Sequence, residues 1–363
     1  MSIKKLHRNF IQEHWDNRSL TSFLLLPFAL FYSLIQYLRR SLFSAGVLSS
    51  YQSKSKIISV GNLGIGGNGK TPFTIYLAKY LQAKGNSVSV SHRGYKGEYE
   101  NSIKIISDEN GMKKIAENAG DEPQVIAENL SGISVIVGKD RTKAIKLLEE
   151  KIRPDYVILD DSFQHLKIKR DIDFVLFDAK NPLGNGFTIP AGKLREPKST
   201  LKHADFLVFN NCPENYQIPK WAIKYKKPII KTIYKLSHFI EFSSKKNVKP
   251  ETLQAQKVFL LSGIGTPNSF EKSIENTGII FSEHFVFPDH YAFDQDKDIQ
   301  PIIEKAIRQN VAVIITTEKD YVKLKDILPA KNHFLYAKLE IEVVGNIAKM
   351  LNTESTGNTE NRL

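Results

Sequence analysis

Residues 64–71 of this chain form the pattern G-x-x-x-x-G-K-T, and both flanks of the pattern are apolar. The residues are, in order, Gly64, Ile65, Gly66, Gly67, Asn68, Gly69, Lys70 and Thr71. Ile57–Val60 is typical of a buried strand, and Pro72–Leu81 is typical of a helix that ends near Gly85. Glycines allow successive backbone N–H groups to converge on phosphate oxygens, and the helix N-terminus adds partial positive charge. The sequence therefore predicts a phosphate-binding loop, with an incidental glycine-rich turn as the alternative.

A second polar group follows another apolar stretch. Tyr156–Leu159 leads directly into Asp160 and Asp161. An acid at the end of such a strand binds Mg²⁺ in proteins with this type of phosphate loop, directly or through water. In the same chemistry Lys70 reaches the outer phosphates and Thr71 ligates the metal. The alternative for the acids is a turn in which an aspartate caps the strand end.

Short apolar runs alternate with helical segments from about Lys56 to Asn211. The predicted strands include Ser87–Ser91, Ile133–Gly138, Tyr156–Asp160, Phe174–Phe177 and Phe206–Phe209, with a helix over Arg141–Lys151. Continuous apolar strands separated by helices are typical of a parallel sheet covered on both faces. We therefore predict an α/β fold with a doubly wound, mostly parallel sheet.

The rest of the chain predicts a second, smaller α/β unit. Its strands are expected at Val258–Ser262, His284–Phe287 and Val311–Thr316, with helices near Pro267–Asn276 and Asp298–Gln309. Ile229–Phe242 resembles a pair of extended strands, and a polar linker candidate follows at 243–250. The predicted divisions are an N-terminal helical segment over 1–50, a main domain over 51–228, a two-stranded linker over 229–256, a smaller α/β domain over 257–345 and a polar tail over 346–363.

The N-terminal segment is strongly apolar from Phe23 to Leu38 and is followed by Arg39 and Arg40. Its uninterrupted apolar core is shorter than the roughly 20 residues of a spanning helix. Pro27 is expected to kink the helix or to begin a second one. One interpretation is an interfacial helix with its apolar face in lipid and its arginines at the headgroups. The alternative is a helix packed on the core of the protein.

The chain of 363 residues has a formal net charge of +12 and a single cysteine, Cys212. One cysteine excludes an internal disulfide and a cysteine-based zinc site, and it fits a reducing compartment. The positive charge favours anionic partners such as nucleic acid, acidic lipid or phosphorylated substrates. No nucleic-acid-binding motif accompanies the charge, so nucleic acid is not an expected partner.

Several other polar loops are candidates for one cleft. They contain Arg93 and Tyr95, Asp121 before a helix, His165 after the paired acids, Arg195 and Glu196, His290, and the run Thr316–Asp320. Loops after strand ends hold the ligands of open α/β sheets. From residue chemistry alone, Asp121 is better explained as a helix cap than as a reacting carboxylate. His165 stays open between a structural and a functional role.

Taken in order, these motifs resemble the tetraacyldisaccharide 4′-kinase family, the lipid A 4′-kinases of Gram-negative bacteria. The matching segments are the apolar N-terminus, Gly61–Asn62, the glycine-rich loop, Arg93–Tyr95, Gly120–Pro123, Gly138–Arg141, Asp160–His165, Pro190–Pro197, Phe287–His290 and Thr317–Asp320. Three positions depart from the usual motifs, namely His92, Ser162 and Lys193. None of the three removes an expected reacting group.

The resemblance implies a P-loop NTPase-like fold and an ATP- and Mg²⁺-dependent kinase. Its acceptor would be the 4′-hydroxyl of a tetraacyl glucosamine disaccharide 1-phosphate, and its product lipid IVA. Asp121 and His290 match the family's catalytic dyad, which replaces the cap interpretation of Asp121 and implies closure between the two domains. Arg93, Tyr95, Arg141, His165, Arg195 and Glu196 match positions associated with substrate or catalytic support.

The resemblance also implies a protein at the cytoplasmic face of the inner membrane, attached peripherally through the N-terminal helix. An anionic membrane surface is then a partner, and no obligate protein partner is expected. The rival hypothesis is a membrane-bound nucleotide switch whose output is partner binding. A G-protein would carry an N-K-x-D motif for base recognition, and the sequence contains none.

Overall fold

The chain forms one fourteen-stranded sheet in the computed structural model, which describes residues 14–66, 69–95, 97–328 and 333–344. Its N-terminal half is mostly parallel and centres on β1 (Lys56–Asn62), which lies between β6 (Tyr156–Asp160) and β7 (Ile172–Asp178). The flanking strands are β2 (Val88–His92) and β5 (Ser134–Val137) on one side and β8 (Phe206–Asn210) on the other. All residues of these three strands are buried, as expected of parallel strands with both faces covered.

Helices cover both faces of this half. The residues of α4 (Lys70–Ala83) and α5 (Asp121–Asn129) share one hydrophobic core with Ile58 of β1. Those of α6 (Arg141–Lys151) share a second core with Ile57, which points to the opposite face. The predicted doubly wound architecture is therefore confirmed. The antiparallel edge formed by β3 (Lys104–Asp108) and β4 (Gly111–Met112) was not predicted.

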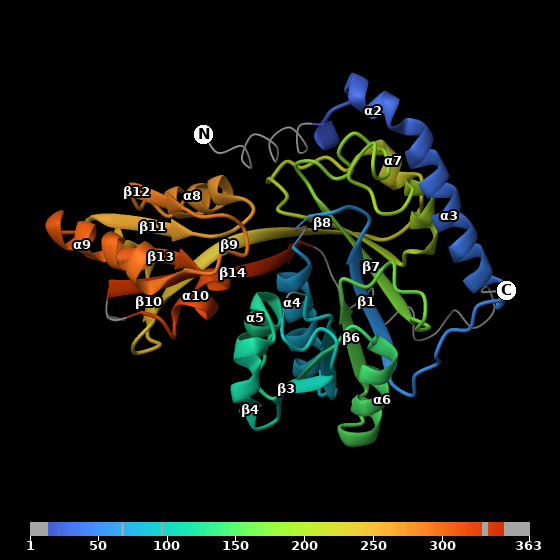
Figure 1. Cartoon of the computed structure of the whole chain (residues 1–363), viewed down its shortest axis with the longest axis horizontal. Coiled ribbons are helices and arrows are strands. Elements are labelled where there is room, and N and C mark those ends of the chain that lie inside the picture. The colour runs from blue at the N-terminus through green and yellow to red at the C-terminus, as the bar shows by residue number, and fades with distance from the viewer. Residues whose placement is uncertain (1–13, 67–68, 96, 329–332, 345–363) are drawn as a thin grey trace.

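The C-terminal half continues the same sheet with four strands. In spatial order these are β12 (Phe281–Val286), β11 (Val258–Ser262), β13 (Val313–Thr317) and β14 (Phe334–Val344), and they are parallel to one another. The helices are α8 (Pro267–Glu275), α9 (Gln300–Arg308) and α10 (Glu318–Leu324). The expected strands and helices are present here, but β14 was not predicted. Figure 1 shows this half as the orange and red part of the molecule.

A single long strand joins the two halves. Sequence analysis predicted a pair of strands over 229–242, whereas the structure has one strand, β9 (Ile229–Glu241), and a short antiparallel partner, β10 (Asn247–Val248). β9 pairs with β8 through its first three residues and with β14 from Lys231 to Glu241. It is paired along almost its whole length, on one edge by β14 and on the other by β8 at its start and by β10 near its end. The sheet thus crosses the predicted domain boundaries, which remain predictions, and 346–363 lies outside the described residues.

The N-terminal segment forms two helices, α2 (Leu20–Leu24) and α3 (Leu26–Ser44), and Pro27 lies in the first turn of the second. Figure 1 shows them along the outside of the half that contains β1. Only Ala29 and Arg40 of α3 are buried. In the described part of the chain, no helix combines the length and the apolar character that crossing a bilayer needs. Many apolar side chains of this segment are exposed: Leu20, Phe23, Leu24, Phe28, Leu30, Phe31, Leu34, Ile35 and Leu38.

The side of α3 that contacts the protein is polar. Tyr32 Oη donates to the carbonyl of Arg195 at 2.9 Å, and Ser33 Oγ lies 2.8 Å from Thr188 Oγ1. Arg40 pairs with Glu196 at 2.7 Å, and the two side chains are 6% and 0% exposed. Arg39 donates to the carbonyl of Gln164. The expectation that these arginines point toward headgroups is therefore wrong, because both bind loops of the protein.

The buried Arg40–Glu196 pair generates a prediction about stability. Glu196→Ala leaves a buried guanidinium without its carboxylate, so we expect the free energy of unfolding to fall by about 3–5 kcal/mol in urea denaturation. The matched control is Glu342→Ala, which breaks the exposed pair with Lys235 and should cost less than about 1 kcal/mol. An Arg40→Met/Glu196→Leu double variant should recover most of the loss. Equal stability of Glu196→Ala and wild type would show that the Arg40–Glu196 pair does not stabilise the packing of α3 on the protein.

Candidate active site

The glycine-rich loop leaves the end of β1 and enters α4. Gly66 and Gly69 have φ values of +119° and +71°, which favour glycine, and α4 begins at Lys70 without a side-chain cap. Its first N–H groups are therefore left for an anion. Gly67 and Asn68 lie outside the described residues.

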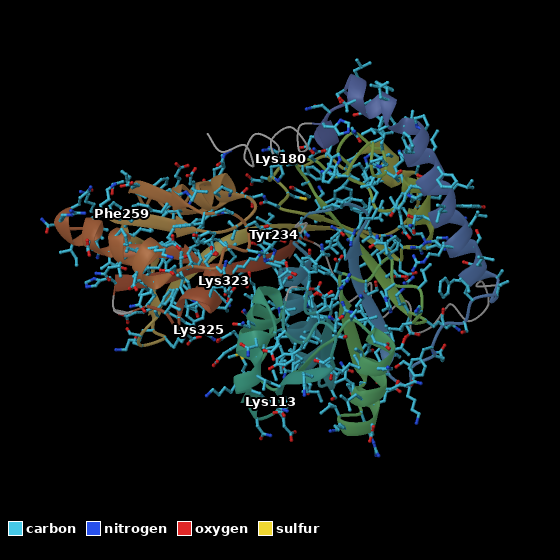
Figure 2. The ribbon with its side chains drawn as sticks, viewed as in Figure 1. Lys113, Lys180, Tyr234, Phe259, Lys323 and Lys325 are labelled. Carbon is cyan, nitrogen blue, oxygen red and sulfur yellow. The ribbon has the colours of Figure 1, made fainter. Side chains whose placement is uncertain are left out.

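Tyr234 of β9 reaches this loop from the strand that joins the two halves (Figure 2). Its hydroxyl donates to the carbonyl of Gly69 at 3.3 Å. A Cβ atom at Gly69 would lie 1.7 Å from that hydroxyl oxygen, so the position requires glycine for space as well as for its backbone angle. Sequence analysis missed Tyr234, since nothing local to residue 234 indicates a contact with residue 69.

Asp160 lies beside the start of α4, at the end of the strand next to β1. Its carboxylate accepts from Thr71 Oγ1 at 3.3 Å and from Thr74 Oγ1 at 3.2 Å. Burial raises the pKa of Asp160 despite the nearby positive charges. Arg141 donates to the carbonyl of Asp160 at 2.7 Å and to Ser91 Oγ at 3.1 Å, and burial lowers its pKa to about 10. Arg141 thus supports the strand that carries the acid.

Asp161 faces the two cations of the site. Its carboxylate is 3.6 Å from Lys70 Nζ and accepts from both terminal nitrogens of Arg195, at 2.7 and 3.2 Å. Burial opposes its ionisation, but Lys70 and Arg195 outweigh burial and hold its pKa well below the usual range. Arg195 also bonds the side chain of Asn62, a residue of β1 that belongs to one of the segments matching the family but was not among the predicted site residues. These contacts place Lys70, Asp161 and Arg195 in one charged cluster.

His92, one of the departures from the family motif, fills the space between two acids. Its Nδ1 accepts from the N–H of Gly94 at 2.9 Å, so the other ring nitrogen carries the proton. That nitrogen lies 3.2 Å from the carboxylate of Glu122 and 3.8 Å from that of Asp160. The hydrogen bond from His92 lowers the pKa of Glu122 to about 2. His92 therefore joins the start of α5 to the end of β6.

Asp121 and His290 are in contact across the two halves of the molecule. His290 Nδ1 lies 3.0 Å from the carboxylate of Asp121, although 169 positions separate the two residues. The residue that caps α5 is Gly120, and Asp121 is the first helical residue, so the cap interpretation is wrong. Burial opposes ionisation of Asp121, but the His290 hydrogen bond and the charge of Lys323 lower its pKa overall. Lys319, which was not singled out individually, lies 3.2 Å from His290 Nε2.

Four predicted site residues lie away from these contacts. Arg93 pairs with Glu100 at 2.9 Å, and its guanidinium carbon lies 6.0 Å from the ring centre of Tyr95. Burial lowers the pKa of His165 to about 4, and among the described residues its Nε2 has no hydrogen-bond partner. Glu196 faces α3 rather than the charged cluster. Their expected contact with substrate stays a prediction.

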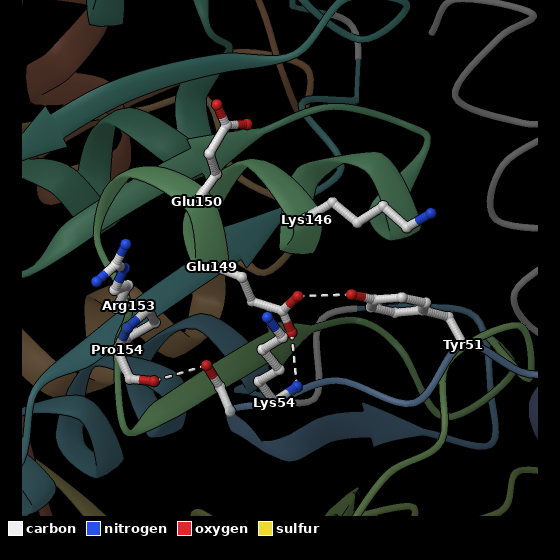
Figure 3. Close-up of a pocket in the computed structure, with 8 residues that line it drawn as sticks. Tyr51, Lys54, Lys146, Glu149, Glu150, Arg153 and Pro154 are labelled. Atoms are coloured by element: carbon white, nitrogen blue, oxygen red, sulfur yellow. Dashed lines mark hydrogen bonds between the residues drawn. The ribbon is translucent and has the colours of Figure 1, made fainter.

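A pocket with a volume of about 710 Å³ lies beside the N-terminal ends of β1 and β6 (Figure 3). Its lining includes Tyr51, Lys54 and Glu149. Tyr51 donates to the Glu149 carboxylate at 2.5 Å, and the N–H of Lys54 donates to it at 2.7 Å. This carboxylate is satisfied within the protein, and the pocket is separate from the phosphate loop.

A glycine-rich loop between a parallel strand and a helix, with an acid at the end of the adjacent strand, defines a P-loop protein that binds nucleotide phosphates. A model of the family described as tetraacyldisaccharide-1-P 4′-kinase matches residues 21–355. The chain belongs to this family, and it is therefore an ATP-dependent kinase of lipid A biosynthesis. The expectations of fold, family and kinase activity are confirmed.

Individual relatives agree over most of their length. The tetraacyldisaccharide 4′-kinase of Pelobacter propionicus is 36% identical over 326 residues, which are 90% of this chain and 89% of the relative. That of Haemophilus influenzae is 35% identical over 330 residues, which are 91% of each chain. A crystal structure of an apo form of LpxK from Aquifex aeolicus in complex with ATP has 30% identity and a TM-score of 0.76. The match covers 92% of this chain and 99% of that one.

The contact between Gly69 and Tyr234 generates a prediction about nucleotide affinity. Gly69→Ala should weaken ATP binding, measured by calorimetry, by about tenfold or more, since the new methyl group displaces Tyr234 or the loop. The control is Gly85→Ala at the other end of α4. Gly85 has a similar φ of +84° but no atom near its Cβ position, so this variant should lose stability and keep its ATP affinity. Equal ATP affinity in both variants would contradict the steric argument.

Proposed function

We propose that this kinase transfers the γ-phosphoryl group of ATP to the 4′-hydroxyl of tetraacyldisaccharide 1-phosphate at the edge where Asp121 meets His290. The observation that carries the proposal is the 3.0 Å contact between these two side chains, which come from opposite halves of the sheet. Family membership supports the acceptor and the product, lipid IVA. The glycine-rich loop supplies the nucleotide side of the same site.

The dyad provides for removal of the hydroxyl proton. The Asp121 carboxylate accepts a hydrogen bond from the proton-bearing Nδ1 of His290, which leaves the lone pair of Nε2 to accept a proton from the sugar alcohol. The carboxylate orients the ring and stabilises the imidazolium that forms. As the alcohol oxygen bonds to phosphorus, the bond from phosphorus to the bridging oxygen breaks and ADP leaves with the electron pair.

The nucleotide phosphates are held by backbone N–H groups of the loop and by Lys70. Before nucleotide binds, Asp161 holds the Lys70 ammonium within 3.6 Å and Arg195 within 2.7 Å, so both cations are already placed at the end of β6. Phosphate oxygens then replace the carboxylate as partners of Lys70. Asp161 and Arg195 serve here as positioning and charge-neutralising groups.

The residues present fit a magnesium ion that is shared with phosphate. Thr71 Oγ1 and the buried carboxylate of Asp160 lie 3.3 Å apart beside the loop, and both are hard oxygen donors. Within the described residues, no cluster of three histidine, cysteine or acidic side chains forms a complete metal cage. This composition suits Mg²⁺, which keeps several waters and binds phosphate oxygens. When bound, Mg²⁺ neutralises charge on the phosphates; Thr71 and Asp160 would hold it, with Asp161 nearby.

The outer face of α2 and α3 is proposed to lie in the acyl boundary of an anionic membrane, at the cytoplasmic face of the inner membrane. The exposed apolar residues of this segment form a band with few charges, and its polar side bonds the protein. Such a band gains free energy at a lipid surface. Because the polar side of α3 touches the carbonyl of Arg195, attachment through this helix holds the substrate-binding edge near the bilayer.

The role of the dyad predicts a selective loss of rate. His290→Ala should lower kcat for a lipid disaccharide monophosphate by about 10²–10⁴-fold, with ATP affinity unchanged, because the base is lost and the phosphate loop is intact. The matched control is His284→Gln, which alters a similar histidine–carboxylate pair, with Glu271 at 2.6 Å, that does not include Asp121 or His290. Product is measured by mass spectrometry as one added phosphate. Normal turnover by His290→Ala would exclude the dyad as the proton acceptor.

Membrane attachment is tested by point substitutions, since deletion of α3 would also remove the buried Arg40–Glu196 pair. A Leu24→Glu/Phe31→Glu variant should co-sediment less with phosphatidylglycerol vesicles, because two exposed apolar residues become charged. The control is Ile307→Glu, at a 68% exposed position on α9. If Leu24→Glu/Phe31→Glu and wild type bind vesicles equally, the apolar band is not the attachment surface.

A further inference from the structure

A lysine from the C-terminal half contacts the nitrogen of His290 that faces away from Asp121. Lys319 Nζ lies 3.2 Å from His290 Nε2 and 3.0 Å from the carboxylate of Asp289. Its side chain is 22% exposed and that of His290 is 27% exposed, so both groups are partly accessible to solvent. The roles proposed above for the phosphate loop and for the Asp121–His290 pair assign no function to the ammonium group of Lys319.

The position of Lys319 is fixed by the turn that begins α10. Thr317 caps the helix by accepting from the N–H of Asp320, and it donates to the Asp320 carboxylate at 2.7 Å. The same carboxylate accepts from the N–H of Gly263 at 2.9 Å and pairs with Lys323 at 2.7 Å. Asp320 is fully buried. This network holds the N-terminal turn of α10 against the loop after β11, so Lys319 projects from a rigid base.

The contact with Lys319 determines which ring nitrogen of His290 carries the proton. An ammonium group can only donate, so Nε2 must accept and the ring proton must lie on Nδ1, facing Asp121. This is the tautomer that a general base in this position needs. The lone pair that Lys319 occupies is the one that an acceptor hydroxyl would use.

The charge of Lys319 also reaches the nucleotide side of the site. The pKa of Asp121 is lowered chiefly by its hydrogen bond with His290, and that of Glu122 chiefly by its hydrogen bond with His92. The positive charge of Lys319 makes a smaller contribution in the same direction to both carboxyl groups. Lys70 of the phosphate loop acts on the same Glu122 carboxylate. Lys319 therefore lies within electrostatic range of both the dyad and the region that the phosphate loop serves.

We propose that Lys319 is a further catalytic residue of the phosphoryl transfer. When the acceptor binds, the ammonium of Lys319 releases its hydrogen bond to His290 Nε2, and the sugar hydroxyl donates to Nε2 in its place. The ammonium then binds a non-bridging oxygen of the transferred phosphoryl group. The hydroxyl proton passes to His290 Nε2, the new O–P bond forms, and the bond to the β,γ-bridging oxygen breaks. Lys319 remains protonated throughout and neutralises charge that is concentrated in the transition state. This inference rests on the proposed function of the Asp121–His290 edge.

The experiment compares Lys319→Met, Lys319→Gln and Lys319→Arg with wild type, using ATP, Mg²⁺ and a lipid disaccharide monophosphate in mixed micelles. Phosphorylation by wild type tests the proposed function separately, because absence of product there would refute that function rather than the role of Lys319. We expect Lys319→Met and Lys319→Gln to lower kcat by about 10²-fold or more, with unchanged ATP affinity and thermal unfolding. Lys319→Arg, which keeps the charge, should recover at least about tenfold of that loss.

The matched control is Lys325→Met, at the residue that follows α10, which pairs with Glu128 at 2.8 Å and should keep the wild-type kcat (Figure 2). A kcat for Lys319→Met within about threefold of wild type would overturn the proposal, since loss of a transition-state contact costs far more. Equal impairment of Lys319→Arg and Lys319→Met would overturn the electrostatic role. A loss of ATP affinity or thermal stability in Lys319→Met that matches the loss of rate would make Lys319 structural.

Discussion

The parallel pairing of β1 with β6 is the constraint on which the site depends. Val60 lies opposite Asp160 in this register, so the strand that leads into the phosphate loop ends beside the strand that carries the acids. Thr71, at the start of α4, then meets the Asp160 carboxylate, and Lys70 meets Asp161. A shift of one residue would turn these side chains to the opposite face of the sheet. Phosphate binding, metal binding and charge balance therefore follow from one strand pairing.

Much of this arrangement could be predicted because its signals are local. The apolar strands, the glycine-rich loop and the acids after Leu159 are read within a few residues of sequence, and each lies at the expected end of its strand. Contacts between distant residues could not be predicted in this way. Asp121 has the local chemistry of a helix cap, and only His290, 169 positions away, shows its other role. The family resemblance supplied that pairing. The candidate run Thr316–Asp320 contained Lys319 without pointing to its contact with His290, and Tyr234 had no local signal.

The N-terminal helix shows the same limit. Its sequence predicts an apolar face and a polar face but does not say which one meets the protein. Arg40 is buried because Glu196, 156 positions later, neutralises it, and Phe163 lies under its guanidinium with the carbon 4.7 Å from the ring centre. One of the polar contacts of α3, from Tyr32, ends on the carbonyl of Arg195, whose side chain faces Asp161. A single residue, Arg195, therefore connects the helix that is proposed to meet lipid with the charged cluster.

The shared strand β9 limits how the two halves can move. Its first residues belong to the ladder with β8, and the remainder belongs to the ladder with β14. A rotation that separates Asp121 from His290 must bend or twist this two-stranded ribbon near Lys231, where one set of ladder bonds gives way to the other. Because the ladder bonds of both pairings oppose such a deformation, the paired strands favour the geometry in which the histidine and the carboxylate meet.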